Sequence, residues 1–229
     1  MPTLEAELAE ARSLSVGELA DAIESIGFEC TRCGACCKGS EADPHTATVF
    51  PDETRRLLDA DVGTSQEQPQ PTGADDSAEW RDVVRPTPFG LDADGTGETF
   101  EWALQTDACG DCAFYDDGAP EAPGTCTVYP DRPLICQTYP FSVDLAGSTP
   151  MGAVVDTAGP VNAHECEGLG REIDRADAES LAATLKHRAV RELEEAIAVR
   201  EQYEPADAEG PVVHDSEGAK RPDGSLVRR

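Results

Sequence analysis

The feature that most constrains this chain is a run of four cysteines within eight residues, Cys30-Thr-Arg-Cys33-Gly-Ala-Cys36-Cys37. Two residues between thiols allow a tight turn to direct both sulfurs at one metal ion, and Gly34 lets the backbone bend there. Five more cysteines follow later in the chain: Cys109, Cys112, Cys126, Cys136 and Cys166. Four closely spaced thiols, together with a second group of cysteines later in the chain, indicate a site for a metal ion or an iron–sulfur cluster.

Other uses of cysteine fit this pattern less well. A disulfide framework is disfavoured by the odd count of nine and by an expected cytoplasmic location. Isolated cysteines that act as small hydrophobic residues do not cluster in this way, and a redox dithiol needs one Cys-x-x-Cys pair. The cytoplasmic expectation rests on residues 1–10, which lack the positive start and apolar centre of a signal peptide, and on the lack of a membrane-spanning apolar run.

The charge of the chain excludes several classes of partner. Lysine and arginine number 18 against 46 aspartate and glutamate residues, a formal net charge of −28. Such a field disfavours binding to nucleic acid or to an anionic membrane, so we expect neither as a partner. A surface rich in carboxylate and poor in lysine is typical of halophilic proteins, because dissolved salt screens the self-repulsion, and we interpret this chain in that way.

The same negative field bears on the cysteines. It favours the protonated form of a free thiol, whereas a bound cation holds thiolates ionised. Arg32 and Lys38 flank the cysteine run, where they either offset thiolate charge or form ordinary surface ion pairs. Aromatic residues make up only 5% of the chain and the mean hydropathy is −0.43, which predicts a thin hydrophobic core. Metal binding would then contribute folding energy, on the order of 10 kcal/mol for a structural site.

Helices are predicted at both ends of the cysteine region. Apolar residues recur at helical spacing from Leu4 to Ile26, Ser15 with Glu18 forms a capping box, and Gly27 marks a helix stop. A short helix is predicted over 51–60 and a long one over 174–203. The long helix carries an apolar stripe that is typical of a face docked on a core: Leu181, Leu185, Ala189, Leu193 and Ile197.

Short strands complete an α+β fold with a small, loop-rich, metal-organised core flanked by the N-terminal and C-terminal helices. The alternating pattern predicts strands over 81–85, 99–104 and 151–156. We predict four parts of the chain: an N-terminal helical segment over 1–27, a cysteine-cluster metal-binding domain over 28–171 with a flexible linker over 61–78, a C-terminal helix over 172–204 that packs on the core, and a disordered tail over 205–229.

Four motifs resemble the YkgJ-type CxxCxxCC cysteine-cluster family, whose members are described as zinc- or iron-chelating domains. They are Cys30-x2-Cys33-x2-Cys36-Cys37, Cys112-Ala-Phe-Tyr, Cys126-Thr-Val-Tyr129-Pro-Asp-Arg132-Pro133-Leu-Ile-Cys136 and Cys166-Glu-Gly-Leu-Gly-Arg171. The resemblance covers about residues 28–171. It implies that eight cysteines are the metal ligands: Cys30, Cys33, Cys36, Cys37, Cys112, Cys126, Cys136 and Cys166. Cys109 lies outside the family pattern.

The residues leave several points of the site open. Adjacent side chains such as Cys36 and Cys37 tend to point apart, which allows two metal centres or one centre with a spare thiol. His164 is an alternative ligand because it lies two residues before Cys166. Arg132 either donates to sulfur, which raises the potential of a cluster, or pins its own loop.

The metal and the biochemical role are also predicted only in outline. The Cys-x2-Cys-x2-Cys spacing favours an iron–sulfur cluster, a [4Fe–4S] cluster in particular, and Zn²⁺ is the alternative. We expect a cytoplasmic protein that serves electron transfer or metal handling. One alternative is an iron–sulfur-dependent lysine methyltransferase-like enzyme, since the cysteine region is similar to that of flagellin lysine methylases. Another is a zinc-stapled module whose long helix docks a protein partner.

Overall fold

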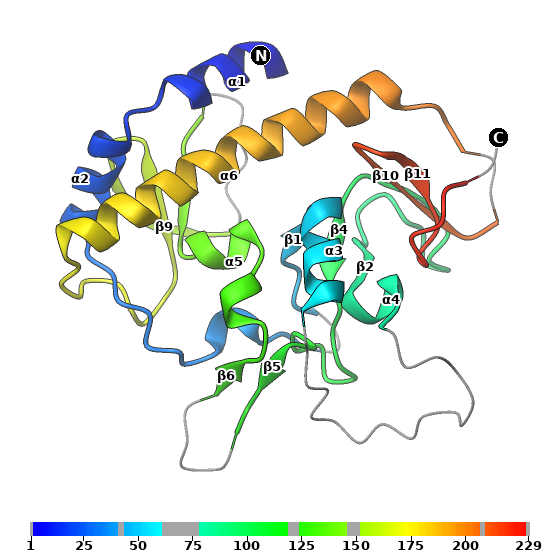
Figure 1. Ribbon diagram of the computed structural model, residues 1–229, viewed down its shortest axis with the longest axis horizontal. Helices are drawn as coiled ribbons and strands as arrows, with labels where there is room; N and C mark the ends of the chain where they lie inside the picture. Colours follow the sequence, from blue (N-terminus) through cyan, green and yellow to red (C-terminus); the bar gives the residue numbers. More distant parts are fainter. Residues whose placement is uncertain are drawn as a thin grey trace. The chain divides into compact units, whose positions relative to one another are not determined.

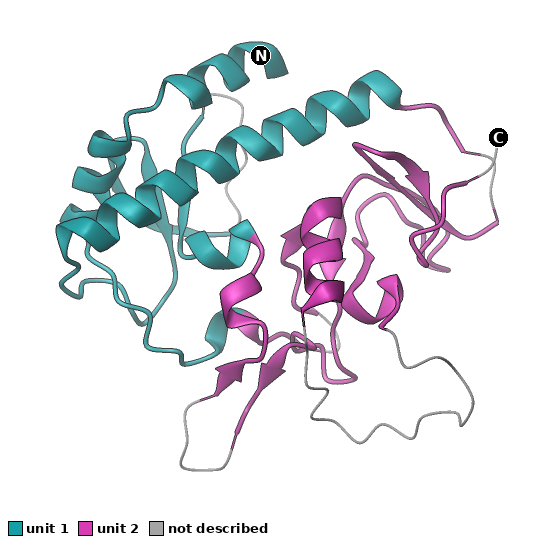
Figure 2. Cartoon of the chain, in the orientation of Figure 1, with its two compact units in different colours: residues 1–36, 134–202 teal, residues 37–133, 203–229 magenta. Residues whose placement is uncertain are grey.

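The computed structural model describes residues 2–40, 44–60, 78–118, 124–145, 152–206 and 209–227. Within these ranges the fold is α+β, as the sequence predicts, with helices and several small sheets (Figure 1). The chain divides into two compact units (Figure 2). Unit 1 comprises residues 1–36 and 134–202, and unit 2 comprises residues 37–133 and 203–229. The predicted domain over 28–171 crosses this division, and the predicted linker lies outside the described residues except for Ala78.

Unit 1 is a helical layer on a small antiparallel sheet. Its helices are α1 (Leu4–Ser13), α2 (Val16–Ile26), α5 (Leu134–Thr138) and α6 (Arg175–Gln202). Its strands are β7 (Phe141–Val143), β8 (Val154–Ala158) and β9 (Val161–His164), in the order β7-β9-β8. The long helix α6 packs along α1 and α2, as Figure 1 shows.

Two of the predicted signals at the N-terminal helices are confirmed, the cap at Ser15 and the stop at Gly27. The backbone N–H of Glu18 donates to Ser15 Oγ at 3.4 Å, so Ser15 caps α2. Gly27 ends that helix with φ of 76°, a left-handed conformation that glycine adopts without strain. Phe28 then packs edge-on to Phe141, with ring centroids 5.5 Å apart. The chain therefore enters the cysteine run from a fixed point on the core.

The apolar stripe of α6 is buried in the core of unit 1. Leu185, Ala189 and Leu193 are buried, and Leu181 and Ile197 pack against the same cluster. Arg188 is also buried on this helix, and its guanidinium donates to Thr138 Oγ1 at 3.0 Å and to the carbonyl of Phe141. The stripe thus packs on the core of unit 1, as its pattern predicted.

Unit 2 contains small sheets and short helices. Its helices are α3 (Pro51–Asp59), α4 (Trp80–Val83) and the 3-10 turn η2 (Tyr129–Asp131), and η1 (Ala35–Cys37) lies at its start. One sheet has the order β1-β4-β2 (Thr48–Val49, Trp102–Leu104, Val84–Pro86), and another has the order β11-β10-β3 (Gly218–Lys220, Pro211–Asp215, Gly97–Thr99). The hairpin β5-β6 (Tyr115–Asp116, Thr125–Cys126) carries one of the family cysteines.

Two sequence expectations about unit 2 are wrong. Residues 81–83 belong to α4 rather than to a strand, because Asp82 accepts from the backbone N–H of Glu79 at 2.7 Å and closes the first helical turn. The stretch predicted as a disordered tail contains β10 and β11. Strand β10 pairs parallel to β3 and antiparallel to β11, and it buries Val212 and Val213.

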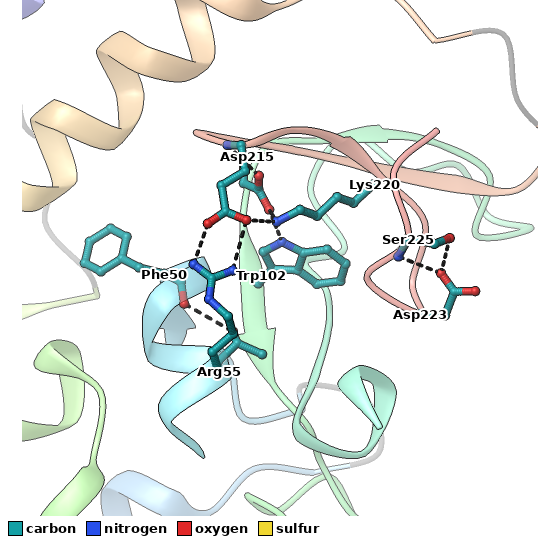
Figure 3. Close-up of polar contacts among 9 residues, drawn as sticks. Phe50, Arg55, Trp102, Asp215, Lys220, Asp223 and Ser225 are labelled. Carbon is teal, nitrogen blue, oxygen red and sulfur yellow. Dashed lines mark hydrogen bonds and ion pairs between the residues drawn. The ribbon is translucent and has the colours of Figure 1, made fainter. Parts of the chain in front are cut away.

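Buried charges also hold this C-terminal hairpin in unit 2, as Figure 3 shows. Lys220 Nζ lies 2.8 Å from Asp215 Oδ2 and 2.7 Å from Glu217 Oε2. The indole N–H of Trp102 donates to Asp215 Oδ2 at 2.8 Å, and Arg55 pairs with Glu217. Charged residues of a segment that resembles a polar tail in the sequence are thus paired with one another and with Trp102 and Arg55.

Candidate metal centre

In unit 1, backbone pairing brings the start of the cysteine run against the segment that carries Cys166. Phe28 and Leu169 form an antiparallel bridge. The N–H of Glu29 donates to the carbonyl of Gly168 at 3.1 Å, and the N–H of Gly170 donates to that of Gly27 at 3.0 Å. The Thr31 hydroxyl adds a hydrogen bond to Glu167 Oε1 at 2.5 Å. Segments 27–31 and 166–170 therefore lie side by side.

This pairing needs a glycine at position 168. A Cβ at Gly168 would lie 2.3 Å from the carbonyl oxygen of Glu29, a distance that only a backbone shift can relieve. The turn of the cysteine run has its own backbone requirement, since both Arg32 (φ 58°) and Gly34 (φ 75°) are left-handed. Gly34 adopts the left-handed conformation without strain. Arg32 adopts it although it is not a glycine, and its side chain is exposed.

Cys30 and Cys166 lie on these paired segments, and two further cysteines of unit 1 follow in the same run. We call these four thiols the unit-1 sulfur group: Cys30, Cys33, Cys36 and Cys166. The first three are exposed and Cys166 is half-buried. Burial raises the pKa of the Cys166 thiol, and the negative charges of Cys33, Cys36 and Cys30 raise it further. The N–H of Gly168 donates to Cys166 Sγ at 3.4 Å and opposes this rise in pKa. Ionisation of the cysteines of the run therefore disfavours ionisation of Cys166.

Tyr139 lies beside the unit-1 sulfur group. Its hydroxyl donates to the carbonyl of Glu165 at 2.5 Å, directly before Cys166. Burial raises the pKa of Tyr139, and the charges of Cys166, Cys36 and Cys33 contribute to the rise. The N–H of His164 donates to the carbonyl of Pro140 at 2.9 Å, so the ladder between β7 and β9 continues toward the cysteine. Both contacts fix the backbone on which Cys166 stands.

In unit 2, a second backbone pairing joins the end of the cysteine run to the segment 107–112. The N–H of Cys112 donates to the carbonyl of Cys37 at 2.8 Å. The N–H of Gly39 donates to Asp111 Oδ1 at 2.8 Å, and the N–H of His45 donates to the carbonyl of Gly110 at 2.8 Å. Here too a glycine is required, because a Cβ at Gly110 would lie 2.3 Å from a carbonyl oxygen, that of Ser40.

Three thiols belong to this second arrangement, which we call the unit-2 sulfur group: Cys37, Cys112 and Cys126. Cys112 is buried, whereas Cys37 and Cys126 are half-buried. Cys126 lies on β6 opposite Tyr115, whose N–H donates to the carbonyl of Cys112 at 2.9 Å. Lys38 Nζ pairs with Asp117 Oδ1 at 2.6 Å and lies 5.4 Å from the Tyr115 ring centroid. Lys38 thus forms the surface ion pair that the sequence left as one of two options.

The remaining candidate residues have separate positions. Cys136 is half-buried on α5 in unit 1, and Cys109 is exposed in unit 2, where its N–H donates to Asp107 Oδ1 at 2.8 Å. His164 is buried on β9, its Nε2 lies 2.9 Å from Ser142 Oγ, and burial lowers its pKa. Arg132 stacks over Tyr129 at 3.7 Å from the ring centroid and donates to the carbonyl of Tyr129, which ties its loop together.

The donor chemistry of the sulfur groups fits a thiophilic metal. All nine cysteines lie within the described residues, and they are thiols rather than disulfides. As the side chains stand, no three His, Cys, Asp or Glu residues in the described part of the chain converge closely enough to hold an ion. The N–H···S hydrogen bond at Cys166 is of the kind that supports metal-bound thiolates.

Sequence reasoning predicted the cysteines as ligands and did not reveal the backbone contacts around them. Close backbone contacts are made by Glu29, through its carbonyl, and by Gly168 and Gly110. The spacing of residue types in the sequence does not reveal such contacts. The hydrogen bond from Tyr139 to the carbonyl of Glu165 is likewise a contact between residues distant in sequence, which no motif predicts.

Comparison with known proteins identifies the same region. Residues 29–167, more than half of the chain, match the family model CxxCxxCC, described as "Putative zinc- or iron-chelating domain". No curated protein and no solved structure matches the chain. None of the described helices is long and apolar enough to cross a membrane. The matched stretch contains every cysteine of the chain, and the chain belongs to the CxxCxxCC family of zinc- or iron-chelating domains.

Proposed function

We propose that this protein holds a redox-active iron–sulfur cluster on the unit-1 sulfur group and serves electron transfer or metal handling. The observation that carries the proposal is the backbone pairing of segments 27–31 and 166–170, which places the segment of Cys166 against the start of the run that carries Cys30, Cys33 and Cys36. Four cysteine thiolates, three of them at Cys-x2-Cys-x2-Cys spacing, form the ligand set that [4Fe–4S] clusters use. Such a cluster supplies one-electron oxidation and reduction.

The surrounding residues suit an exchangeable or redox-active site more than a sealed structural one. Cys30, Cys33 and Cys36 are exposed, so a partner can approach the site directly. Gly168 donates to the Cys166 sulfur, and such donors stabilise the added negative charge of a reduced cluster. Tyr139 holds the adjacent carbonyl and thereby orients Cys166.

Zinc is the second candidate for the same ligand set. Its support is the number of donors, since four cysteine sulfurs form a closed tetrahedral structural site. The family description includes both metals. A zinc site here would staple segments 27–36 and 166–170 together and would have no redox role.

Anaerobic purification of the full chain distinguishes the two metals. An iron–sulfur protein is brown, contains iron and acid-labile sulfide, and bleaches with dithionite. A zinc protein is colourless and contains zinc by elemental analysis. If the purified protein contained neither iron nor zinc at a stoichiometric level, that result would contradict the proposal.

Cys33→Ser tests the ligand assignment. We expect the variant to lose most of the bound metal, because one of four anionic ligands is removed from an exposed loop. Cys109→Ser is the matched control, since it removes an exposed thiol that lies in neither sulfur group, and it should keep the metal content of the parent. Equal metal content in both variants would contradict the assignment of Cys33.

A further inference from the structure

Two aromatic rings from distant parts of the sequence meet on the surface of unit 2. The ring centroids of Phe100 and Tyr203 are 5.5 Å apart, and the ring planes are tilted by 58°. Both residues are exposed, Phe100 at 47% and Tyr203 at 40%. Exposed aromatic side chains that are held together in this way are typical of contact surfaces, where aromatic residues are enriched.

The buried side chain of His214 holds both rings in place. His214 lies on β10 (Figure 1), its ring stacks on that of Phe100 with centroids 5.6 Å apart, and it meets the Tyr203 ring edge-on at 4.9 Å. We call Phe100, Tyr203 and His214 the aromatic platform. Because its rings are fixed before any partner arrives, binding to it costs little side-chain entropy.

A half-buried carboxylate, that of Glu98, adjoins the aromatic platform. Its Oε2 accepts from the Tyr203 hydroxyl at 3.0 Å, and its Oε1 accepts from the N–H of Ala206 at 2.6 Å and lies 2.9 Å from His214 Nε2. The hydrogen bond from Ala206 lowers the pKa of Glu98, so the carboxylate is charged at neutral pH. A carboxylate accepts about four hydrogen bonds, and the described residues supply three, which leaves room for one more donor at Oε2.

The segments that build this surface are acidic. They are residues 97–101, 203–206 and 211–215. Besides Asp215, which is paired with Lys220, they carry Glu98, Glu101 and Glu204, and they contain no lysine or arginine. The whole chain adds a net charge of −28. Charge complementarity therefore favours a cationic partner at this surface.

We infer that the aromatic platform and Glu98 form a docking surface for a protein partner that presents an arginine side chain. A guanidinium group is planar, stacks on aromatic rings and donates to a carboxylate at the same time. An ammonium group is compact and more strongly hydrated, so lysine fits this combination less well. The inference uses no cysteine and is therefore independent of the proposed function.

A fluorescently labelled synthetic peptide, with arginines separated by glycines, tests the inference by fluorescence anisotropy with the full chain. Matched peptides carry lysine or citrulline in place of arginine, and citrulline keeps the planar shape of the side chain but removes its charge. We expect the arginine peptide to bind most tightly, the lysine peptide to bind more weakly and the citrulline peptide not to bind.

Phe100→Leu tests the contribution of the rings, because it removes an aromatic face and keeps an apolar side chain. We expect the affinity for the arginine peptide to fall about 3-fold to 10-fold. Phe89→Leu is the matched control. Phe89 is 68% exposed in the same unit and makes none of the ring contacts of the aromatic platform, so this variant should bind as the parent does.

A second measurement uses the parent chain alone and so does not depend on how the variants fold. The arginine peptide, carrying a benzophenone group, is photo-crosslinked to the parent chain, and the attachment points are identified by mass spectrometry. The crosslinks should map to residues 97–101 and 203–206.

Three results would overturn the inference: no binding of the arginine peptide to the parent chain, equal binding of the citrulline peptide, or crosslinks that map elsewhere. Equal affinities of Phe100→Leu and Phe89→Leu would also overturn it, because binding would then reflect only the general attraction of the net charge. Each of these results leaves the metal content of the protein, and with it the proposed function, unaffected.

Discussion

At the scale of single residues, the candidate site depends on backbone contacts of a residue that is not a cysteine. Gly168 combines two of them, because its carbonyl accepts from Glu29 and its N–H donates to the Cys166 sulfur. The same residue leaves no room for a side chain. The position of Cys166 relative to Cys30 is therefore set by a backbone pairing rather than by the metal alone.

Gly168→Ala tests this dependence. The added Cβ would force the Glu29 carbonyl away, which separates Cys166 from the start of the cysteine run. We expect the metal-free protein to lose roughly 1–3 kcal/mol of unfolding free energy and the metal affinity of the unit-1 sulfur group to fall about 10-fold or more. Urea unfolding and Co²⁺ titration measure the two effects.

Gly17→Ala is the matched control for this substitution. Gly17 lies in α2, and a Cβ there would be 3.7 Å from its nearest neighbour, Ser15 Oγ. Within a helix, a change from glycine to alanine stabilises the folded protein by up to about 1 kcal/mol. We expect it to leave cobalt binding unchanged. If the two alanine variants behaved alike, the close approach at Gly168 would have no role in arranging the cysteines.

At the scale of elements, local signals predicted those parts of the fold that local physics decides. Ser15 and Gly27 bound α2 as expected, and the four-residue repeat of apolar side chains located α6. The signal failed where an element is stabilised by distant partners. Residues 211–220 form strands because β3 pairs with β10 and because Trp102 and Arg55 are partners for the carboxylates of this segment. The strand β3, Trp102 and Arg55 all lie far from residues 211–220 in the sequence.

The same reasoning applies to the candidate site. The spacing of the cysteines predicted a ligand set, but it did not show which later segment pairs with each side of the cysteine run. Whether Cys36 and Cys37 serve one centre or two depends on which later segment pairs with each side of the run. Such long-range backbone pairing leaves no periodic trace in the sequence.

Lys220→Met tests the role of the C-terminal hairpin. The lysine is buried between Asp215 and Glu217, so its loss leaves Asp215 buried with an uncompensated charge. Removal of one partner from a buried pair costs about 3–5 kcal/mol, and we expect unit 2 to lose that amount of unfolding free energy. Trp80 and Trp102, the only tryptophans of the chain, lie beside Lys220 and Asp215 and report the transition by fluorescence in urea.

An exposed ion pair of the same unit supplies the control. Arg81 pairs with Glu79, and both side chains are more than half exposed. Arg81→Met should therefore cost less than about 1 kcal/mol. If Lys220→Met were as mild as this control, residues 205–229 would behave as the disordered tail that the sequence suggested.

At the scale of the whole molecule, the net charge of −28 opposes folding in dilute buffer. Exposed ion pairs such as Arg175 with Asp21 and Glu24 offset a part of this repulsion. Each exposed pair contributes only about 0–1 kcal/mol, and salt weakens it. Salt screens both the ion pairs and the net repulsion between carboxylates. We expect the net repulsion to be the larger of the two, because every uncompensated carboxylate contributes to it.

Added KCl should therefore stabilise the protein. The Debye length falls from about 10 Å at 0.1 M to about 3 Å at 1 M, which removes most of the long-range repulsion. We expect the Tm of the metal-loaded protein to rise by at least about 5 °C between 0.1 M and 2 M KCl, equivalent to roughly 2 kcal/mol for a chain of this length. Sucrose at matched osmolality controls for effects other than screening and should raise the Tm less. A Tm that falls steadily with KCl would mean that ion pairs outweigh the net repulsion, and the halophilic interpretation of the composition would then be wrong.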